Sequence, residues 1–109
     1  MSDIKELTEK VICFRDERDW KQFHKPKDLA ISMALEAAEV LEHFQWKSDE
    51  ETRKYIKKHK EEIGDELSDV LYWVLTIGHE LHIDLVKAFN RKMVKTQKNI
   101  PFKNQKANI

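Results

Sequence analysis

Apolar residues recur at intervals of three or four along the segment from residue 63 to residue 81. The repeat is formed by Ile63, Leu67, Val70, Val74, Ile77 and Leu81. This is the period of an α-helix, and Leu71, Tyr72 and Leu75 extend the apolar character to the opposite flank. A helix that is apolar nearly all round is buried on more than one side. In a chain of 109 residues, the second side is expected to meet another copy of the chain.

The whole chain is predicted to be helical, because it has only two Gly and two Pro and therefore few turn signals. The four expected helices span residues 3 to about 20, about 28 to 46, 49 to 82, and 84 to about 99. The run Ser48-Asp49-Glu50-Glu51 is a capping box at the start of the third. Whether residues 49–82 form one helix or two stays open, since Gly64 is a possible break. We predict an all-α, four-helix bundle-like fold in a single domain covering residues 1–109, with a polar tail from about residue 101.

Charge and cysteine content narrow the class of protein. The 20 basic and 20 acidic residues balance, which gives no general attraction to nucleic acid or to an anionic membrane. No apolar run approaches the roughly 20 residues needed to span a bilayer. The first residues lack the basic-then-apolar layout of a signal peptide, and Cys13 is the single cysteine. We therefore expect a cytoplasmic protein without disulfides.

Two acidic pairs stand inside the apolar helical sequence, Glu36 with Glu39 and Glu66 with Asp69. A spacing of three residues places both carboxylates of a pair on one helix face. A carboxylate in apolar surroundings is costly unless its charge is compensated. Four such groups on two facing helices predict a Mg²⁺ site that works on a nucleoside triphosphate. Glu62, one turn before Glu66 on the same flank, is a candidate outer ligand or base.

Other interpretations of the acidic pairs need different partners. A solvated helix face also shows acidic residues at this spacing. A di-iron bundle uses Glu-x-x-His, which is absent, since His43 is four residues after Glu39. A zinc site could use His79 and His82, but no second pair of Cys or His completes it.

Aromatic residues accompany the predicted metal site. Three tryptophans are many for so short a chain, and indole rings near bound phosphates suit a nucleobase. The polar segment around Trp20 adds groups for hydrogen bonds to a base edge, and a lysine can meet phosphate oxygens. The candidate nucleotide-binding residues are Trp20, Gln22, His24, Trp46, Trp73 and Lys92.

The combined pattern resembles the MazG-like nucleotide pyrophosphohydrolases of the all-α NTP pyrophosphatase superfamily, and within it the dCTP pyrophosphatase branch. Besides the two acidic pairs, the resemblance rests on three segments. They are Arg18-Asp19-Trp20-Lys21-Gln22-Phe23-His24-Lys25-Pro26, Phe44-Gln45-Trp46-Lys47 and Glu66-Leu67-Ser68-Asp69-Val70-Leu71. It covers residues 4 to 101. Trp73 stands where the family often has Tyr.

The resemblance implies a Mg²⁺-dependent enzyme that hydrolyses a deoxynucleoside triphosphate to the monophosphate and pyrophosphate. It implies that Glu36, Glu39, Glu66 and Asp69 are metal ligands. It also implies that residues 20–24, Trp46 and Trp73 line the nucleotide pocket. Members often assemble as homotetramers, here expected as a dimer of dimers.

We therefore expect a nucleotide-pool housekeeping hydrolase that favours dCTP or a modified cytosine nucleotide. The nucleotide is the expected partner, without a nucleic acid polymer or a membrane. One alternative keeps the chemistry and changes the base, to dUTP or dATP. The other is a non-catalytic helical oligomerisation module whose acidic cluster binds a cation.

Overall fold

The computed structural model describes residues 3–100, which form four α-helices and one short 3₁₀ helix. They are α1 (Asp3–Glu17), η1 (Trp20–Phe23), α2 (Pro26–Glu42), α3 (Asp49–Glu80) and α4 (Leu85–Asn99). No strand occurs between residues 3 and 100, so the all-α prediction is confirmed for this part of the chain. None of the helices within these residues is long and apolar enough to cross a membrane. The predicted tail from residue 101 lies outside the described residues, and the single domain stays a prediction.

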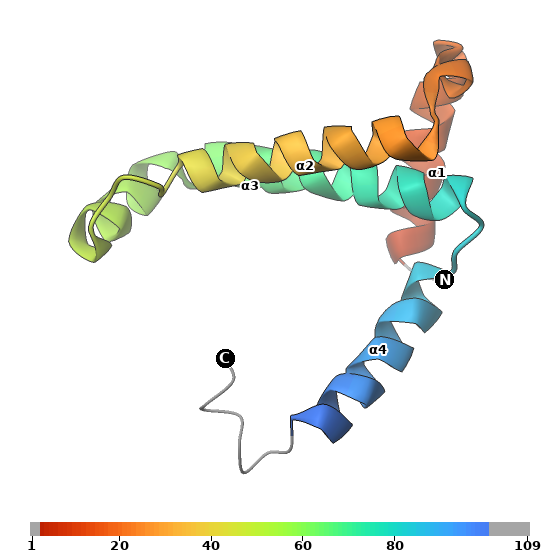
Figure 1. Cartoon of the computed structure of the whole chain (residues 1–109). Helices are drawn as coiled ribbons and strands as arrows, with labels where there is room; N and C mark the ends of the chain where they lie inside the picture. Colours follow the sequence, from red (N-terminus) through yellow and green to blue (C-terminus); the bar gives the residue numbers. More distant parts are fainter. Residues whose placement is uncertain (1–2, 101–109) are drawn as a thin grey trace.

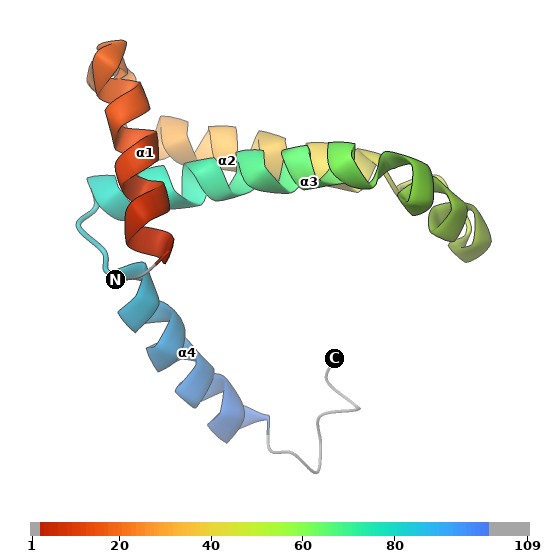
Figure 2. The same cartoon turned by 180° about the vertical axis from the view of Figure 1, so that it is seen from behind.

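Helices α2 and α3 form an antiparallel hairpin that makes up most of the packed body (Figure 1). Helix α1 crosses the C-terminal part of α3, as the view from behind shows (Figure 2). Helix α3, the second helix of the hairpin, begins at the predicted capping box. The Glu51 amide donates to Ser48 Oγ at 3.2 Å, and the Ser48 amide donates to Glu51 Oε1 at 2.9 Å. These two bonds satisfy N–H groups that have no partner inside the helix.

The helix boundaries differ from the prediction at three places. Helix α1 ends at Glu17 instead of about residue 20, and the chain turns through a left-handed residue, Asp19 (φ 58°), into η1. Helix α2 begins at Pro26, which suits a first helical turn, and ends at Glu42 instead of residue 46. Helix α3 runs from residue 49 to residue 80 but is divided into two helical segments by a kink at His59. Its irregular backbone is at His59 (φ −120°, ψ 21°), whereas Gly64 is helical.

A buried ion pair joins α1 to the end of α3. Arg15 is only 2% exposed, and its Nη1 donates to Glu80 Oε2 at 2.7 Å, while its Nε donates to Asp16 Oδ1 at 3.0 Å. A buried guanidinium is tolerated only when its charge is paired and its donors are satisfied. The pair therefore fixes how α1 lies across α3, and with it the position of Trp20 just beyond α1.

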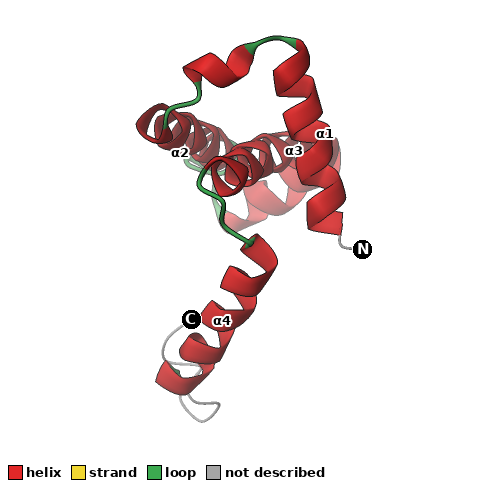
Figure 3. Cartoon of the chain, turned by 90° about the vertical axis from the view of Figure 1, so that its right-hand side faces the viewer, coloured by secondary structure: helices red, strands yellow, loops and turns green. Residues whose placement is uncertain are grey.

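Helix α4 points away from the other three helices instead of lying alongside them, so the described chain is not a closed four-helix bundle (Figure 3). The chain reverses through His82, a second left-handed residue (φ 56°), and Asp84 caps α4 by accepting from the Lys87 amide at 3.0 Å. Only the start of α4 lies close to α3, where Leu85 approaches Gly78, and further along the helix Phe89 is 67% exposed.

Large apolar side chains are also exposed on α2 and α3. Ile31 and Leu35 on α2 are exposed, as are Leu67 and Leu71 on α3. These residues extend the apolar character of both helices beyond the α2–α3 contact, as the sequence predicts. Few large apolar residues are fully buried within residues 3–100, Leu29 and Leu75 among them. Burial of apolar surface therefore contributes little to the free energy of folding of one isolated chain.

The two glycines of α3 give a matched test of this packing. A Cβ at Gly78 would lie 2.8 Å from Leu85 Cδ1 and 2.9 Å from Leu85 Cγ, whereas a Cβ at Gly64 meets no atom within 4 Å. We expect Gly64→Ala to raise the free energy of unfolding by about 0.5–1 kcal/mol, through the better helix propensity of Ala. Gly78→Ala should lower it by about 1–3 kcal/mol, because Leu85 and the start of α4 must shift. Urea denaturation measures both, and equal effects of the two variants would contradict the contact.

Candidate metal centre

Four carboxylates converge where α2 and α3 pack together. Glu36 and Glu39 come from α2, and Glu66 and Asp69 come from the facing turns of α3. Each residue offers one carboxylate oxygen, and these four oxygens all lie within 4.8 Å of one another. Glu36 and Glu66 are half-buried, while Glu39 and Asp69 are exposed. The two pairs predicted from spacing therefore form one cluster.

The cluster resists carrying its full negative charge. The pKa of Glu36 is raised to about 7, first by a hydrogen bond shared with Glu39, then by burial and by repulsion from the other carboxylates. The pKa of Glu66 is also raised, again chiefly by its hydrogen bond with Glu39, and His43 partly offsets this shift. Like charges at such separations disfavour ionisation, so a proton or a cation is needed to hold the group together.

The donor set fits a hard divalent cation. Oε2 of Glu36 and Oε2 of Glu66 are buried and have no hydrogen-bond partner in the described part of the chain. Buried polar atoms are ordinarily paired, so two orphaned oxygens among four carboxylates favour a bound ion as the missing partner. Carboxylate oxygen is the ligand type that Mg²⁺ and similar ions prefer. The residues present therefore suit Mg²⁺.

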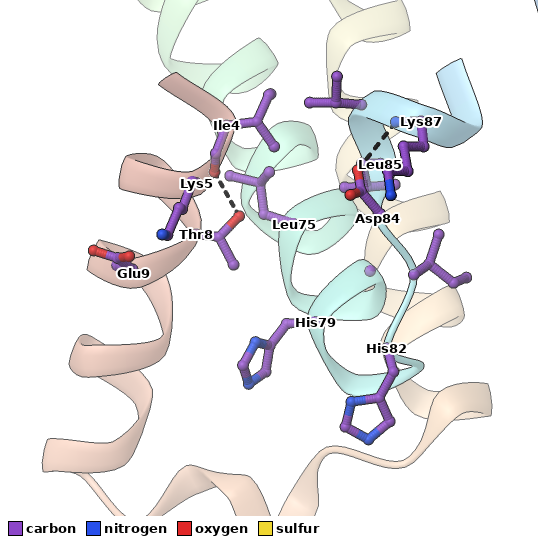
Figure 4. Close-up of a pocket in the computed structure, with 13 residues that line it drawn as sticks. Ile4, Lys5, Thr8, Glu9, Leu75, His79, His82, Asp84, Leu85 and Lys87 are labelled. Atoms are coloured by element: carbon purple, nitrogen blue, oxygen red, sulfur yellow. Dashed lines mark hydrogen bonds between the residues drawn. The ribbon is translucent and has the colours of Figure 1, made fainter. Parts of the chain in front are cut away.

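No histidine of the described residues joins the four converging carboxylates, although His43 lies close enough to act on the pKa of Glu66. Among residues 3–100, the acidic cluster is the group of three or more potential ligands that could hold a metal ion. The ring of His43 is engaged by the hydroxyl of Tyr55, with Nδ1 and Oη 2.5 Å apart. His79 and His82 line a different pocket of about 690 Å³, between the start of α1, the end of α3 and the start of α4 (Figure 4). The geometry therefore favours neither the di-iron nor the zinc interpretation.

Two tryptophans form a partition between two cavities beside the acids. The first cavity, of about 250 Å³, is lined by Phe14, Trp20, Glu36, Asp69, Tyr72 and Trp73. The second, of about 290 Å³, is lined by Trp20, Phe23, His24, Asp28, Leu29, Ser32 and Trp73. Trp20 and Trp73 belong to both. We call the first the acidic cavity and the second the side cavity.

Aromatic contacts hold the partition in place. Phe14 meets the edge of Trp20, with ring centroids 5.5 Å apart, and Tyr72 meets Trp73 at 4.9 Å. His24 lies edge-on to Trp73 at 6.0 Å. Burial raises the pKa of the Tyr72 hydroxyl. The indole rings are thus braced by residues of α1, α3 and the segment before α2.

Sequence reasoning missed Phe14 and Tyr72 as residues of the site. The sequence pattern predicts Tyr72 on the flank of the helix opposite Asp69 and Trp73. In the structure, Asp69, Tyr72 and Trp73 all line the acidic cavity. The position of Tyr72 beside Trp73 was the available signal, because two adjacent rings on a helix can both border a hollow at its edge. Phe14 gave no signal, since its approach depends on how α1 crosses α3.

Several predicted site residues are not brought to the cluster within one chain. Gln22 donates from Nε2 to the Asp19 carbonyl at 2.9 Å. Trp46 is 86% exposed, in the connection between α2 and α3 at the end of the hairpin opposite α1 (Figure 1). Lys92 lies on the projecting α4. Glu62 is exposed and pairs with His59 at 3.1 Å. Their roles stay predictions.

Comparisons with known proteins agree with this geometry. The MazG-like family model matches residues 31–108. The chain is 38% identical over 90 residues to dCTP pyrophosphatase 1 of Rattus norvegicus and 34% identical over 90 residues to that of Homo sapiens, covering 81% of this chain in both cases. It spans about half the length of these relatives, 53%.

A solved structure is similar over nearly the whole chain. The crystal structure of a pyrophosphatase from Archaeoglobus fulgidus matches with a TM-score of 0.86 and 36% identity, covering 93% of this chain and 94% of the other. The acidic cluster lies on α2 and α3, and the family model matches all of α3 and most of α2. With more than half of its residues matched by that model, the chain belongs to the MazG-like family.

Proposed function

We propose that the protein is a Mg²⁺-dependent hydrolase that cuts a deoxynucleoside triphosphate into its monophosphate and pyrophosphate. One observation carries the proposal: two buried carboxylate oxygens without partners, in a cluster of four acids beside a tryptophan-lined cavity. Acids that bind a metal and rings that stack on a base are the two requirements for holding a metal-bound nucleotide.

Each group has a definite task in this proposal. Glu36, Glu39, Glu66 and Asp69 hold the ion, which when bound screens the phosphate charge. Trp20 and Trp73 hold the base, so that the α-phosphorus lies over the acids. Water attacks that phosphorus and pyrophosphate leaves. A carboxylate oxygen not engaged with the ion accepts the proton of the water, for which Glu62 and the exposed Glu39 are the candidates.

The preferred substrate is proposed to be dCTP or a modified cytosine nucleotide. The names of the relatives from rat and human support cytosine. The same chemistry on dUTP or dATP is the second candidate, and a non-catalytic cation-binding module is the third. As such a hydrolase, the protein would remove surplus or non-standard nucleotides from the cytoplasmic pool.

Removing one carboxylate tests catalysis. Glu39→Gln should lower kcat for dCTP at least about 100-fold, because the amide can neither carry the charge that holds the ion nor accept the proton of water. Pyrophosphate release measures turnover, and circular dichroism should show an intact helical fold. Glu42→Gln is the matched control, since Glu42 is an exposed glutamate one turn further along α2, outside the cluster. Full turnover by Glu39→Gln would remove this residue from the site.

The raised pKa of Glu36 predicts how stability responds to pH and metal. The folded chain holds this proton more tightly than the unfolded chain, so the metal-free protein should lose stability as pH rises through about 7. Mg²⁺ replaces the proton, so its increase in Tm should be larger at pH 8 than at pH 5.5. Thermal unfolding with and without Mg²⁺ measures this. In Glu36→Gln the metal-free protein should be more stable than the parent at pH 8, and the opposite result would contradict a strained cluster.

We propose that the chain assembles as a homotetramer, arranged as a dimer of dimers. Support comes from the exposed apolar residues of α2 and α3 and from the projecting α4. Leucine and isoleucine exposed in this number are typical of surfaces that contact other subunits. Trp46 and Lys92, which lie away from the acids of their own chain, are proposed to serve the nucleotide of a neighbouring subunit.

A charge on the apolar face of α4 tests the assembly. Phe89→Glu should reduce the mass measured by light scattering after size exclusion, because burying an unpaired carboxylate in an interface is costly. Lys95→Glu, also exposed on α4, is the control and should keep the mass of the parent. A monomeric parent protein would contradict the proposed assembly without touching the proposed site.

A further inference from the structure

The side cavity contains one buried polar atom without a partner among the described residues, and two further polar side chains line it. Nδ1 of His24 is buried and makes no hydrogen bond within residues 3–100. The carboxylate of Asp28 and the hydroxyl of the half-buried Ser32 likewise have no hydrogen-bond or ion-pair partner among the described residues. Asp28 is exposed and Ser32 is half-buried, so the buried Nδ1 of His24 is the group that points to a ligand, in a hollow that Asp28 and Ser32 also line.

The position of the cavity indicates which part of a nucleotide would enter it. Asp28, Ser32 and Glu36 follow one another at intervals of four along α2 and therefore share a face. Glu36 borders the acidic cavity, while Asp28 and Ser32 border the side cavity across the tryptophan partition. Phosphates drawn to a cation at the acids leave the side cavity for the base. Its volume of about 290 Å³ suits a single ring system better than a whole nucleotide.

The chemistry of Asp28 distinguishes between bases. An ionised carboxylate only accepts hydrogen bonds. Cytosine presents an exocyclic amino group that donates, whereas uracil and thymine present a carbonyl oxygen at the same position. A carboxylate facing that carbonyl would have no donor to meet and would be repelled by it. Discrimination by such a contact is strong, because the wrong base leaves polar groups unpaired.

We propose that Asp28, assisted by Ser32, is a specificity-determining residue that selects a base with an exocyclic amino group over one with a carbonyl group. The inference rests on the proposed function, since it assumes that a nucleotide binds with its phosphates at the acids. It adds the feature of the base that is read and the side chain that reads it.

The test compares Asp28→Asn with the parent protein on matched cytosine and uracil nucleotides. The parent should bind dCMP more tightly than dUMP in calorimetry with Mg²⁺, and should turn over dCTP with a higher kcat/KM than dUTP. An asparagine amide can donate or accept, so in Asp28→Asn both preferences should fall roughly 10- to 100-fold, the effect of one hydrogen bond to a charged group. Ser32→Ala should reduce them less.

Asp49→Asn is the matched control, because it also removes an exposed carboxylate from the first turn of a helix but lies on α3, outside the side cavity. It should leave both preferences unchanged. An unchanged preference in Asp28→Asn, or binding of neither monophosphate by the parent, would overturn the inference. In a further outcome, the parent binds dCMP more tightly than dUMP and Asp28→Asn binds both alike, while neither triphosphate is hydrolysed. That result would support recognition of the base by Asp28 and contradict the proposed hydrolysis.

Discussion

Repulsion among four carboxylates, held together by the packing of α2 against α3, is the constraint on which the structure of this site depends. The hairpin brings four carboxylate oxygens within 4.8 Å of one another, and two buried oxygens have no partner among residues 3–100. Such a cluster is unfavourable in an isolated chain. Folding therefore leaves free energy that a divalent cation can recover on binding. The closeness of the four acids destabilises the metal-free fold, and the same closeness suits them to binding a metal ion.

The position of the aromatic rings depends on a contact between residues distant in sequence. Arg15 on α1 pairs with Glu80 at the end of α3, and this contact sets the path of the chain into Asp19 and Trp20. Because the guanidinium is 2% exposed, loss of Glu80 would leave its buried charge with Asp16 as its remaining partner, which is more costly than losing a surface pair. The ion pair thus acts on the site by placing one wall of it.

Local signals explain what could be predicted from the sequence. The capping box at Ser48 and the cap at Asp84 are short-range features, and both appear where the sequence places them. The acidic pairs were predictable because helical spacing alone puts two carboxylates on one face. The boundary at Glu17, the irregular backbone at His59 and the direction of α4 depend on contacts across the fold. The spacing of apolar residues along the sequence gives no information about such contacts.

The same distinction applies to the residues of the site. Trp20, His24 and Trp73 were expected near the acids; the two tryptophans border both cavities, and His24 borders the side cavity. The assignment of Tyr72 to the far flank was wrong, because a ring at the boundary between two helix faces can turn to either side. Trp46 and Lys92 lie away from the acids of their own chain, and the helical period of the sequence does not indicate this separation.

The shared tryptophan partition means that the two cavities beside the acids are not mechanically independent. Trp20 and Trp73 line both the acidic cavity and the side cavity. A ring that moves toward one of these hollows changes the width of both, because each ring belongs to both walls. A molecule bound in one cavity would therefore alter the shape of the other, so that the two indole rings couple the two cavities.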